Sequence, residues 1–280
     1  MRIGFVTQLL WERYGPFWQR LFEEAGVEVL FPDEEKALAS LDDDRVRSVS
    51  GASFRLAVAQ ALSLAQVDLL VAPSLNPASE ARRGGGQDPW VSDFPAALGT
   101  IGGLPPVLGV PALLAPEQQT LVVETLQQLI RDPGRVRRVW DRHRAALRHE
   151  PVPPPSWTTV AGRKTIGVVG QPWLLRSQLV ERVAPEGVTA IGQHRLDPLL
   201  LREEGERIDP RMIPTDREVL GAVRHFSRRG SVSELHLVID ETSGADIWLR
   251  ERALKQSARE IVVRPLTELV SGPEELLVGL

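Results

Sequence analysis

The feature that most constrains the fold is a strand-like motif that occurs near the start of the chain and again beyond its middle. Residues 2–7 read Arg-Ile-Gly-Phe-Val-Thr, and residues 164–170 read Lys-Thr-Ile-Gly-Val-Val-Gly. Each is followed by a proline beside aromatic residues, Gly-Pro-Phe-Trp at 15–18 and Gln-Pro-Trp at 171–173. Because proline is well tolerated in the first turn of a helix, each motif predicts a buried strand followed by a helix. We therefore expect two copies of one structural plan.

A proline-rich segment separates the two copies. The chain reads Glu-Pro-Val-Pro-Pro-Pro-Ser from residue 150, and consecutive prolines favour an extended backbone, so residues 151–161 are interpreted as a semi-rigid linker. The expected domains are an N-terminal α/β lobe, residues 1–150, which ends in helices, and a C-terminal α/β lobe, residues 162–280. A chain of 280 residues is longer than most single hydrophobic cores, which favours this division.

Strand and helix patterns alternate along both halves. Apolar, partly β-branched runs predict strands at residues 2–9, 27–31, 68–74, 107–113, 164–170, 188–192, 235–239 and 261–265. Helical spacing of apolar residues predicts helices at 17–25, 52–65, 117–130, 134–148 and 216–228, and another from residue 246. Residues 75–106 are rich in turn formers and are expected to form a long loop. Alternating strands and helices form parallel sheets. The predicted fold class is therefore α/β, with two Rossmann-like parallel-sheet lobes and a cleft between them.

Composition limits the chemistry. A net charge of −4 argues against nucleic-acid binding, which normally requires a positive field. No apolar run approaches the roughly 20 residues that span a bilayer, and the start lacks a signal-peptide pattern, so we expect a cytoplasmic protein that binds no membrane. The chain has no cysteine, which excludes disulfides, thiol nucleophiles and thiolate metal sites. The histidines lack metal-type spacing, and neither a metal site nor a catalytic residue is assigned.

Several segments share their order and spacing with a known family. They are Ile3-Gly-Phe5, Tyr14-Gly-Pro-Phe-Trp18, Gly26-Val-Glu-Val-Leu30, Val67-Asp-Leu-Leu-Val-Ala-Pro73, Asp88-Pro-Trp-Val-Ser-Asp-Phe-Pro95, Ile166-Gly-Val-Val-Gly-Gln-Pro-Trp173, Leu220-Gly-Ala-Val-Arg224 and Arg264-Pro-Leu-Thr-Glu-Leu269. In this order they resemble the 2-hydroxyacyl-CoA dehydratase superfamily, most of all the domain associated with acyl-CoA dehydratase activases. The resemblance extends over nearly the whole chain, although each segment alone is a weak hydrophobic pattern.

The cysteines that hold a [4Fe–4S] cluster in that superfamily are replaced in this chain. On the alignment that the resemblance implies, their positions carry Ser50, Ser74 and Asp88, and a further family cysteine falls near residues 240–244. Iron–sulfur clusters are held by thiolates, so a cysteine-ligated cluster is excluded and the radical-type dehydration of the family is not carried over. The resemblance then implies a cluster-free homologue of a dehydratase-type subunit.

Ligands of open α/β sheets bind beyond the carboxyl ends of the strands. Together with the cluster positions, this rule selects the candidate ligand-binding residues of the cleft, which are Ser50, Ser74, Asn76, Asp88, Gln171, Asp240 and Glu241. Asp240 and Glu241 can act as a carboxylate pair in acid–base chemistry or hold a hard cation. The alternative is structural, because serine and aspartate at such positions commonly cap the next helix or stabilise a turn.

A glycine-rich loop is the candidate phosphate site. It combines two guanidinium groups, Arg82 and Arg83, with Gly84, Gly85 and Gly86, whose amides can wrap the phosphates of a CoA thioester or a nucleotide. Its spacing matches neither the P-loop nor the dinucleotide fingerprint. A flexible surface loop is therefore the alternative interpretation.

Four tryptophans lie near the predicted cleft. Trp11, Trp18, Trp90 and Trp173 can hold adenine or another flat group there. Packing in the hydrophobic core is the alternative, because large residues on amphipathic helices are usually buried.

Three functional hypotheses follow. The first is a non-redox binding, regulatory or accessory protein without a cofactor, which binds a small molecule such as an acyl-CoA or a nucleotide-like ligand, or pairs with a related subunit or a second copy. The second is an enzyme that uses cluster-independent carboxylate or metal-assisted chemistry in the cleft. The third is a scaffold that acts only through protein contacts. We favour the first, because the scaffold is complete while the cluster ligands are replaced.

Overall fold

Two four-stranded, all-parallel sheets form the framework of the protein, which confirms the predicted α/β fold class with two Rossmann-like lobes. The computed structural model describes residues 1–76, 84–148, 152, 155, 164–272 and 274–277. The strands are β1 (Arg2–Phe5), β2 (Glu28–Leu30), β3 (Leu69–Ser74), β4 (Val107–Pro111), β5 (Thr165–Val169), β6 (Thr189–Gly192), β7 (Glu234–Ile239) and β8 (Ile261–Pro265). Their order is β2-β1-β3-β4 in one sheet and β6-β5-β7-β8 in the other. The two sheets therefore share one topology.

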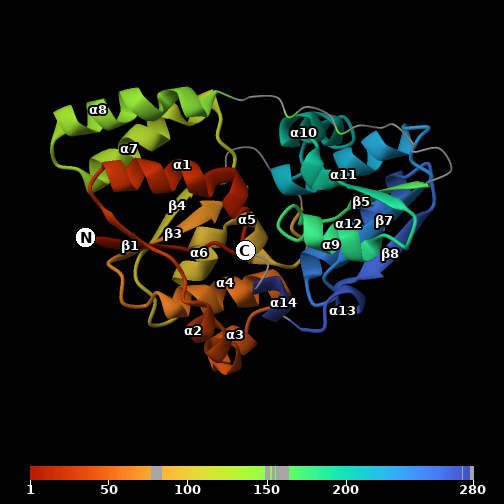
Figure 1. Ribbon diagram of the computed structural model, residues 1–280, viewed down its shortest axis with the longest axis horizontal. Coiled ribbons are helices and arrows are strands. Elements are labelled where there is room, and N and C mark those ends of the chain that lie inside the picture. Colours follow the sequence, from red (N-terminus) through yellow and green to blue (C-terminus); the bar gives the residue numbers. More distant parts are fainter. Residues whose placement is uncertain (77–83, 149–151, 153–154, 156–163, 273, 278–280) are drawn as a thin grey trace.

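Helices connect the strands. They are α1 (Trp11–Glu24), α2 (Glu34–Ala39), α3 (Asp44–Arg47), α4 (Ala52–Ser63), α5 (Pro89–Ser92), α6 (Phe94–Gly99), α7 (Gln119–Leu129), α8 (Pro133–His143), α9 (Ser177–Val183), α10 (Pro198–Glu206), α11 (Pro214–Ser227), α12 (Gly244–Gln256), α13 (Leu266–Leu269) and α14 (Glu274–Leu277), with 3-10 turns η1 (Ser40–Asp42), η2 (Pro116–Gln118), η3 (Arg144–Leu147) and η4 (Gln193–Arg195). In the N-terminal lobe, α1, α7 and α8 lie on one side of the sheet and α2, α3 and α4 on the other (Figure 1). Both faces of the sheet are therefore covered, as a parallel sheet requires.

The repeated sequence motif corresponds to repeated packing. Gly4 in β1 and Gly167 in β5 each face the helix that precedes the third strand of their sheet. A Cβ at Gly4 would lie 3.0 Å from Leu64 at the end of α4, and a Cβ at Gly167 would lie 2.9 Å from the ring of Phe226 in α11. In both lobes the missing side chain lets that helix approach the first strand closely.

The carboxyl ends of the two sheets face each other at the junction of the lobes (Figure 1). The C-terminal segment, which we define as α13, α14 and the described residues between them, also reaches the N-terminal lobe. Its Leu276 packs beside Ala37 and Leu56. Figure 1 shows α14 next to α4. Hydrophobic contacts thus join the end of the chain to the first lobe.

The structure differs from the sequence predictions in local detail. The region 75–106 was expected to be a long loop, but it contains α5 and α6, whose Trp90, Phe94 and Leu98 are buried. Helix α10 was not predicted, although Asp197 caps its N-terminus. The linker predicted at 151–161 lies almost entirely outside the described residues.

Candidate functional site

The residues that follow the third strand of each sheet cap a helix of the opposite lobe. Asp240, directly after β7, accepts a hydrogen bond at Oδ2 from the N–H of Ala52 at the start of α4, with an N···O distance of 2.5 Å. Asn76, which follows β3, accepts one at Oδ1 from the N–H of Thr215 in the first turn of α11, at 3.0 Å. Neither helix receives a side-chain hydrogen bond from its own N-cap residue. The two lobes therefore exchange helix caps, which satisfies N–H groups that have no partner within a helix.

Asp88 makes a third contact of this kind. Its Oδ2 accepts hydrogen bonds from the N–H of Ala245 in the first turn of α12 (3.1 Å) and from Oγ of Ser243 (2.7 Å). Its Oδ1 accepts one from Oγ of Ser50 (2.8 Å). Ser50 and Asp88, two of the three residues that the sequence resemblance aligns with cluster cysteines, are thus hydrogen-bonded to each other. Both oxygens of this buried carboxylate are held by protein donors.

The glycine-rich loop contacts a carboxyl group of the protein itself, that of Asp216. The N–H of Gly85 donates to Oδ2 of Asp216 in α11 (3.0 Å), and a Cβ at Gly84 would lie only 2.3 Å from the same oxygen. The φ angles of residues 84, 85 and 86 are 130°, 68° and 56°, a region that favours glycine. Gln171 donates from Nε2 to Oδ1 of Asp216 (3.1 Å). Arg82 and Arg83, the cationic part of the phosphate-site prediction, lie outside the described residues.

Two buried carboxylates at this junction have raised pKa values. Burial raises the pKa of Asp216 to about 6, although the hydrogen bonds it accepts act in the opposite direction. Burial is also the main cause that raises the pKa of Asp246 well above its usual range. A hydrogen bond from the N–H of Asp240 (2.7 Å) opposes this effect, while the negative charges of Asp240, Asp216 and Asp88 add to it. Within the described chain, Oδ1 of Asp246 and Oε1 of Gln171 are buried without a hydrogen-bond partner.

Two predicted site residues point elsewhere. Oγ of Ser74 lies beside strand β4, where a Cβ at Gly109 would be 2.9 Å from it, and no hydrogen bond among the described residues joins Ser74 to Ser50 or Asp88. Glu241 is exposed and accepts a hydrogen bond from Oγ1 of Thr267 (2.7 Å). The sequence-based candidates therefore do not form one cluster.

The tryptophans serve mainly as core residues. Trp18, Trp90 and Trp173 are buried, and the rings of Trp90 and Trp173, which belong to different lobes, lie 5.3 Å apart. Trp11 is half-buried and packs edge-on against Phe5. These contacts support the structural alternative for Trp18 and Trp90 and add apolar packing to the polar lobe junction. Trp11 and Trp173 also line a pocket of about 230 Å³, so for these two both interpretations stay open.

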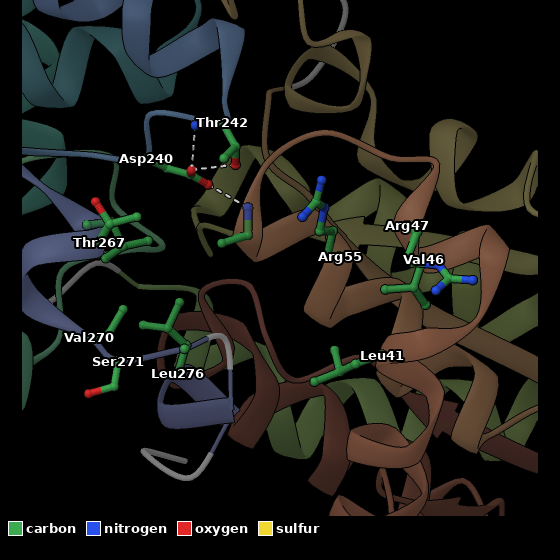
Figure 2. Close-up of a pocket in the computed structure, with 13 residues that line it drawn as sticks. Leu41, Val46, Arg47, Arg55, Asp240, Thr242, Thr267, Val270, Ser271 and Leu276 are labelled. Atoms are coloured by element: carbon green, nitrogen blue, oxygen red, sulfur yellow. Dashed lines mark hydrogen bonds between the residues drawn. The ribbon is translucent and has the colours of Figure 1, made fainter.

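A pocket of about 320 Å³ opens between the lobes beside Asp240 (Figure 2). It is lined by Leu41, Val46, Arg47, Ala52 and Arg55 of the N-terminal lobe and by Asp240, Thr242, Leu266, Thr267, Val270, Ser271, Gly272 and Leu276 of the C-terminal half. Figure 2 shows Arg55, Asp240 and Thr242 at one side of this pocket, and Leu41 and Leu276 at the other. The pocket is therefore amphipathic, with a charged end and an apolar end.

Arg55 carries the positive charge of the pocket. It is half-buried, its Nε donates to the carbonyl of Val49 (2.9 Å), and no carboxylate of the described chain forms an ion pair with it. Arg47, by contrast, is exposed and pairs with Asp44 (2.7 Å). Arg55 was not among the residues predicted from the sequence, although one signal was present: it is the only charged residue of helix α4.

The fold and the pocket define a two-lobed α/β protein with Rossmann-like parallel sheets and a polar junction between their carboxyl ends. Comparisons with protein-family models, with curated proteins and with solved structures gave no match. In the part of the chain that the structure describes, no helix combines the length and apolar character needed to cross a membrane. In the same part, no group of three or more histidine, aspartate or glutamate residues is arranged to hold a metal ion.

Proposed function

We propose that this protein is a non-redox binding protein that takes a small anionic organic ligand in the pocket between its lobes. The observation that carries the proposal is Arg55, a half-buried guanidinium without a carboxylate partner in the described chain, on the wall of a largely apolar pocket. A cation withdrawn from water is unfavourable unless an anion or hydrogen-bond acceptors compensate it, so an anionic ligand stabilises this arrangement. The pocket also lies at the carboxyl end of β7, where ligands of parallel sheets bind.

The proposal includes the relationship to a cluster-free dehydratase-type subunit. It is supported by the oxygen-bearing residues at the positions of the cluster cysteines, Ser50 and Asp88, which hydrogen-bond to each other. In this view, the region that holds iron in the superfamily joins the two lobes here. An accessory role beside a related subunit or a second copy is compatible with ligand binding in the same pocket.

The size of the pocket limits the ligand. A volume of about 320 Å³ lies near the lower end of the roughly 300–1,000 Å³ of small-molecule sites. A whole CoA thioester or dinucleotide is too large for it. An acyl-CoA or nucleotide-like ligand would place only one end in the pocket and the remainder outside.

The enzymatic alternative centres on Asp240, the carboxylate that lines the pocket. Its oxygens accept hydrogen bonds from the N–H of Ala52 and from the N–H and hydroxyl of Thr242, which hold the carboxylate in one orientation at the pocket wall. In this alternative, Asp240 acts as a general base. Incubation of the protein with any ligand it binds, followed by product analysis, separates this alternative from simple binding. If Asp240 is the base, the wild type converts the ligand, and Asp240→Asn still binds the ligand but no longer converts it.

The test of binding is calorimetry and thermal unfolding with a panel of acyl-CoAs, nucleotides, organic acids and phosphates. We expect at least one anion to bind the wild type and to lose its binding in Arg55→Gln. Arg20→Gln is the matched control, because Arg20 is an exposed arginine whose Nε also donates to a backbone carbonyl, that of Pro16. At a ligand concentration one hundred times Kd, stabilisation is about 2.7 kcal/mol. Absence of binding for every anion, or equal binding by Arg55→Gln, would contradict the proposal.

A further inference from the structure

We infer that the ligand is a short-chain aliphatic monocarboxylate, bound as the free acid anion with its carboxylate at Arg55 and its hydrocarbon chain against Leu41, Val270 and Leu276. This inference rests on the proposed function and specifies the ligand class of the same pocket. It commits to a free acid rather than a thioester, a phosphate or a nucleotide.

The charge of the pocket favours a single negative charge. Arg55 contributes one positive charge without a carboxylate partner in the described chain, whereas the charge of Arg47 is paired with Asp44. Asp240 adds a negative charge to the same end of the pocket. A dianion such as a phosphate monoester would therefore meet one unpaired cation and one repelling carboxylate, and a monoanion is the better match.

The hydrogen-bonding geometry of Arg55 favours a planar carboxylate. Its Nε is already used by the carbonyl of Val49, at 2.9 Å, and no hydrogen bond within the described chain uses its two terminal nitrogens. Two neighbouring N–H groups of a guanidinium match the two oxygens of a carboxylate in a bidentate pair. The fixed Nε thus holds the guanidinium in one orientation and leaves its end free for the ligand.

The apolar end of the pocket favours an aliphatic chain. Leu41 comes from the N-terminal lobe, while Val270 and Leu276 come from the C-terminal segment (Figure 2). That segment is held in place by Arg182, which donates to the carbonyl of Leu269 (2.9 Å) and pairs with Glu275. The apolar wall is therefore preformed, and each buried methylene of a ligand gains hydrophobic free energy there.

The experiment is calorimetric titration of the full chain with a series of carboxylates from acetate to octanoate. Affinity is expected to rise up to about fourfold per methylene until the apolar end is filled. The matched carboxamides, which lack the charge, are expected to bind at least about tenfold more weakly, as are alkyl phosphates of equal length. Arg55→Gln is expected to weaken carboxylate binding by about ten- to a hundredfold, and Arg20→Gln to leave it unchanged. Leu276→Ser is expected to reduce the gain per methylene while the protein remains folded by thermal unfolding.

The outcomes separate this inference from the proposed function. If acyl-CoAs or phosphates bind in an Arg55-dependent way and free carboxylates do not, the inference is wrong and the proposed function stands. If carboxamides bind as tightly as carboxylates, the inference is also wrong. If no anion binds at all, both fail. Carboxylate binding that depends on Arg55 and on chain length supports both.

Discussion

Asp240 and Ala52 are 188 positions apart in the sequence, yet Oδ2 of Asp240 lies 2.5 Å from the backbone nitrogen of Ala52 and caps helix α4. Asn76 and Thr215 form the corresponding contact in the opposite direction at 3.0 Å. Each capped helix leads into the third strand of its own sheet. Separation of the lobes would exchange these hydrogen bonds for bonds to water, so each one stabilises the joined lobes by its net value, about 0.5–1.5 kcal/mol and more where the acceptor is charged.

The cross-lobe cap at Asp240 is testable by substitution. Asp240→Ala removes the acceptor of three donors, the N–H of Ala52 and the N–H and hydroxyl of Thr242, and we expect a loss of about 2–3 kcal/mol in the free energy of unfolding. Asp33→Ala is the control, because Asp33 caps the exposed helix α2 within one lobe through the N–H of Lys36. Urea unfolding measures both. An Asp240→Ala loss no larger than that of the control would argue against the cross-lobe role.

The close approach of the glycine loop to α12 predicts a large effect at Gly86. A Cβ there would lie 2.1 Å from the carbonyl oxygen of Gly244, and φ is 56°. Gly187 also has a positive φ, 79°, but a Cβ there would meet nothing within 4 Å. Gly187→Ala therefore measures the backbone strain alone, about 1 kcal/mol, whereas Gly86→Ala is expected to cost at least about 3 kcal/mol. Equal losses in chemical denaturation would show that the loop and α12 are not in contact.

Asp216 predicts a specific pH dependence of stability. Its folded pKa of about 6 exceeds the ordinary 3.8, so the folded state binds the proton more tightly than the unfolded state. The protonated Asp216 therefore contributes to the free energy of unfolding. This contribution is fully present below pH 3.8 and is lost as the pH rises through about 6, a total loss of about 3 kcal/mol. The side chain of Asp216→Asn does not titrate. Its amide oxygen can accept the hydrogen bond from the N–H of Gly85, and its amide nitrogen can donate to the unpaired Oε1 of Gln171 once the side-chain amide of Gln171 is flipped.

The measurement compares the free energy of unfolding of the wild type and Asp216→Asn from pH 4.5 to 8. Asp246 titrates in both proteins, but the negative charge of Asp216 is one of the causes that raise the pKa of Asp246, so the difference reports Asp216 together with its coupling to Asp246. The variant is expected to become progressively more stable than the wild type as the pH rises. A constant difference over this range would show that Asp216 has an ordinary pKa.

Some of this architecture could be predicted from the sequence because it depends on local patterns. Buried strands of a parallel sheet are continuous apolar runs, and runs such as 68–74 and 164–170 correspond to β3 and β5. Within 75–106, short α5 and α6 were hidden among turn formers, because a helix of four or six residues does not display a full helical period. The cap interpretation of Asp240 was correct in its chemistry, but the capped helix is α4 rather than the helix that follows.

The sequence by itself determined the fold class, the duplication and the absence of thiolate chemistry, since these depend on residue type and on short-range periodicity. Only the tertiary structure decided from which N–H group each strand-end side chain accepts a hydrogen bond, and that the N–H of Gly85 in the glycine loop donates to Asp216. It also brought Arg55 and Leu276 to one pocket from opposite ends of the chain. The physical reason is that a hydrogen-bond acceptor can pair with any donor, and an apolar side chain can pack against any apolar neighbour. Long-range packing alone selects which donor or neighbour is present.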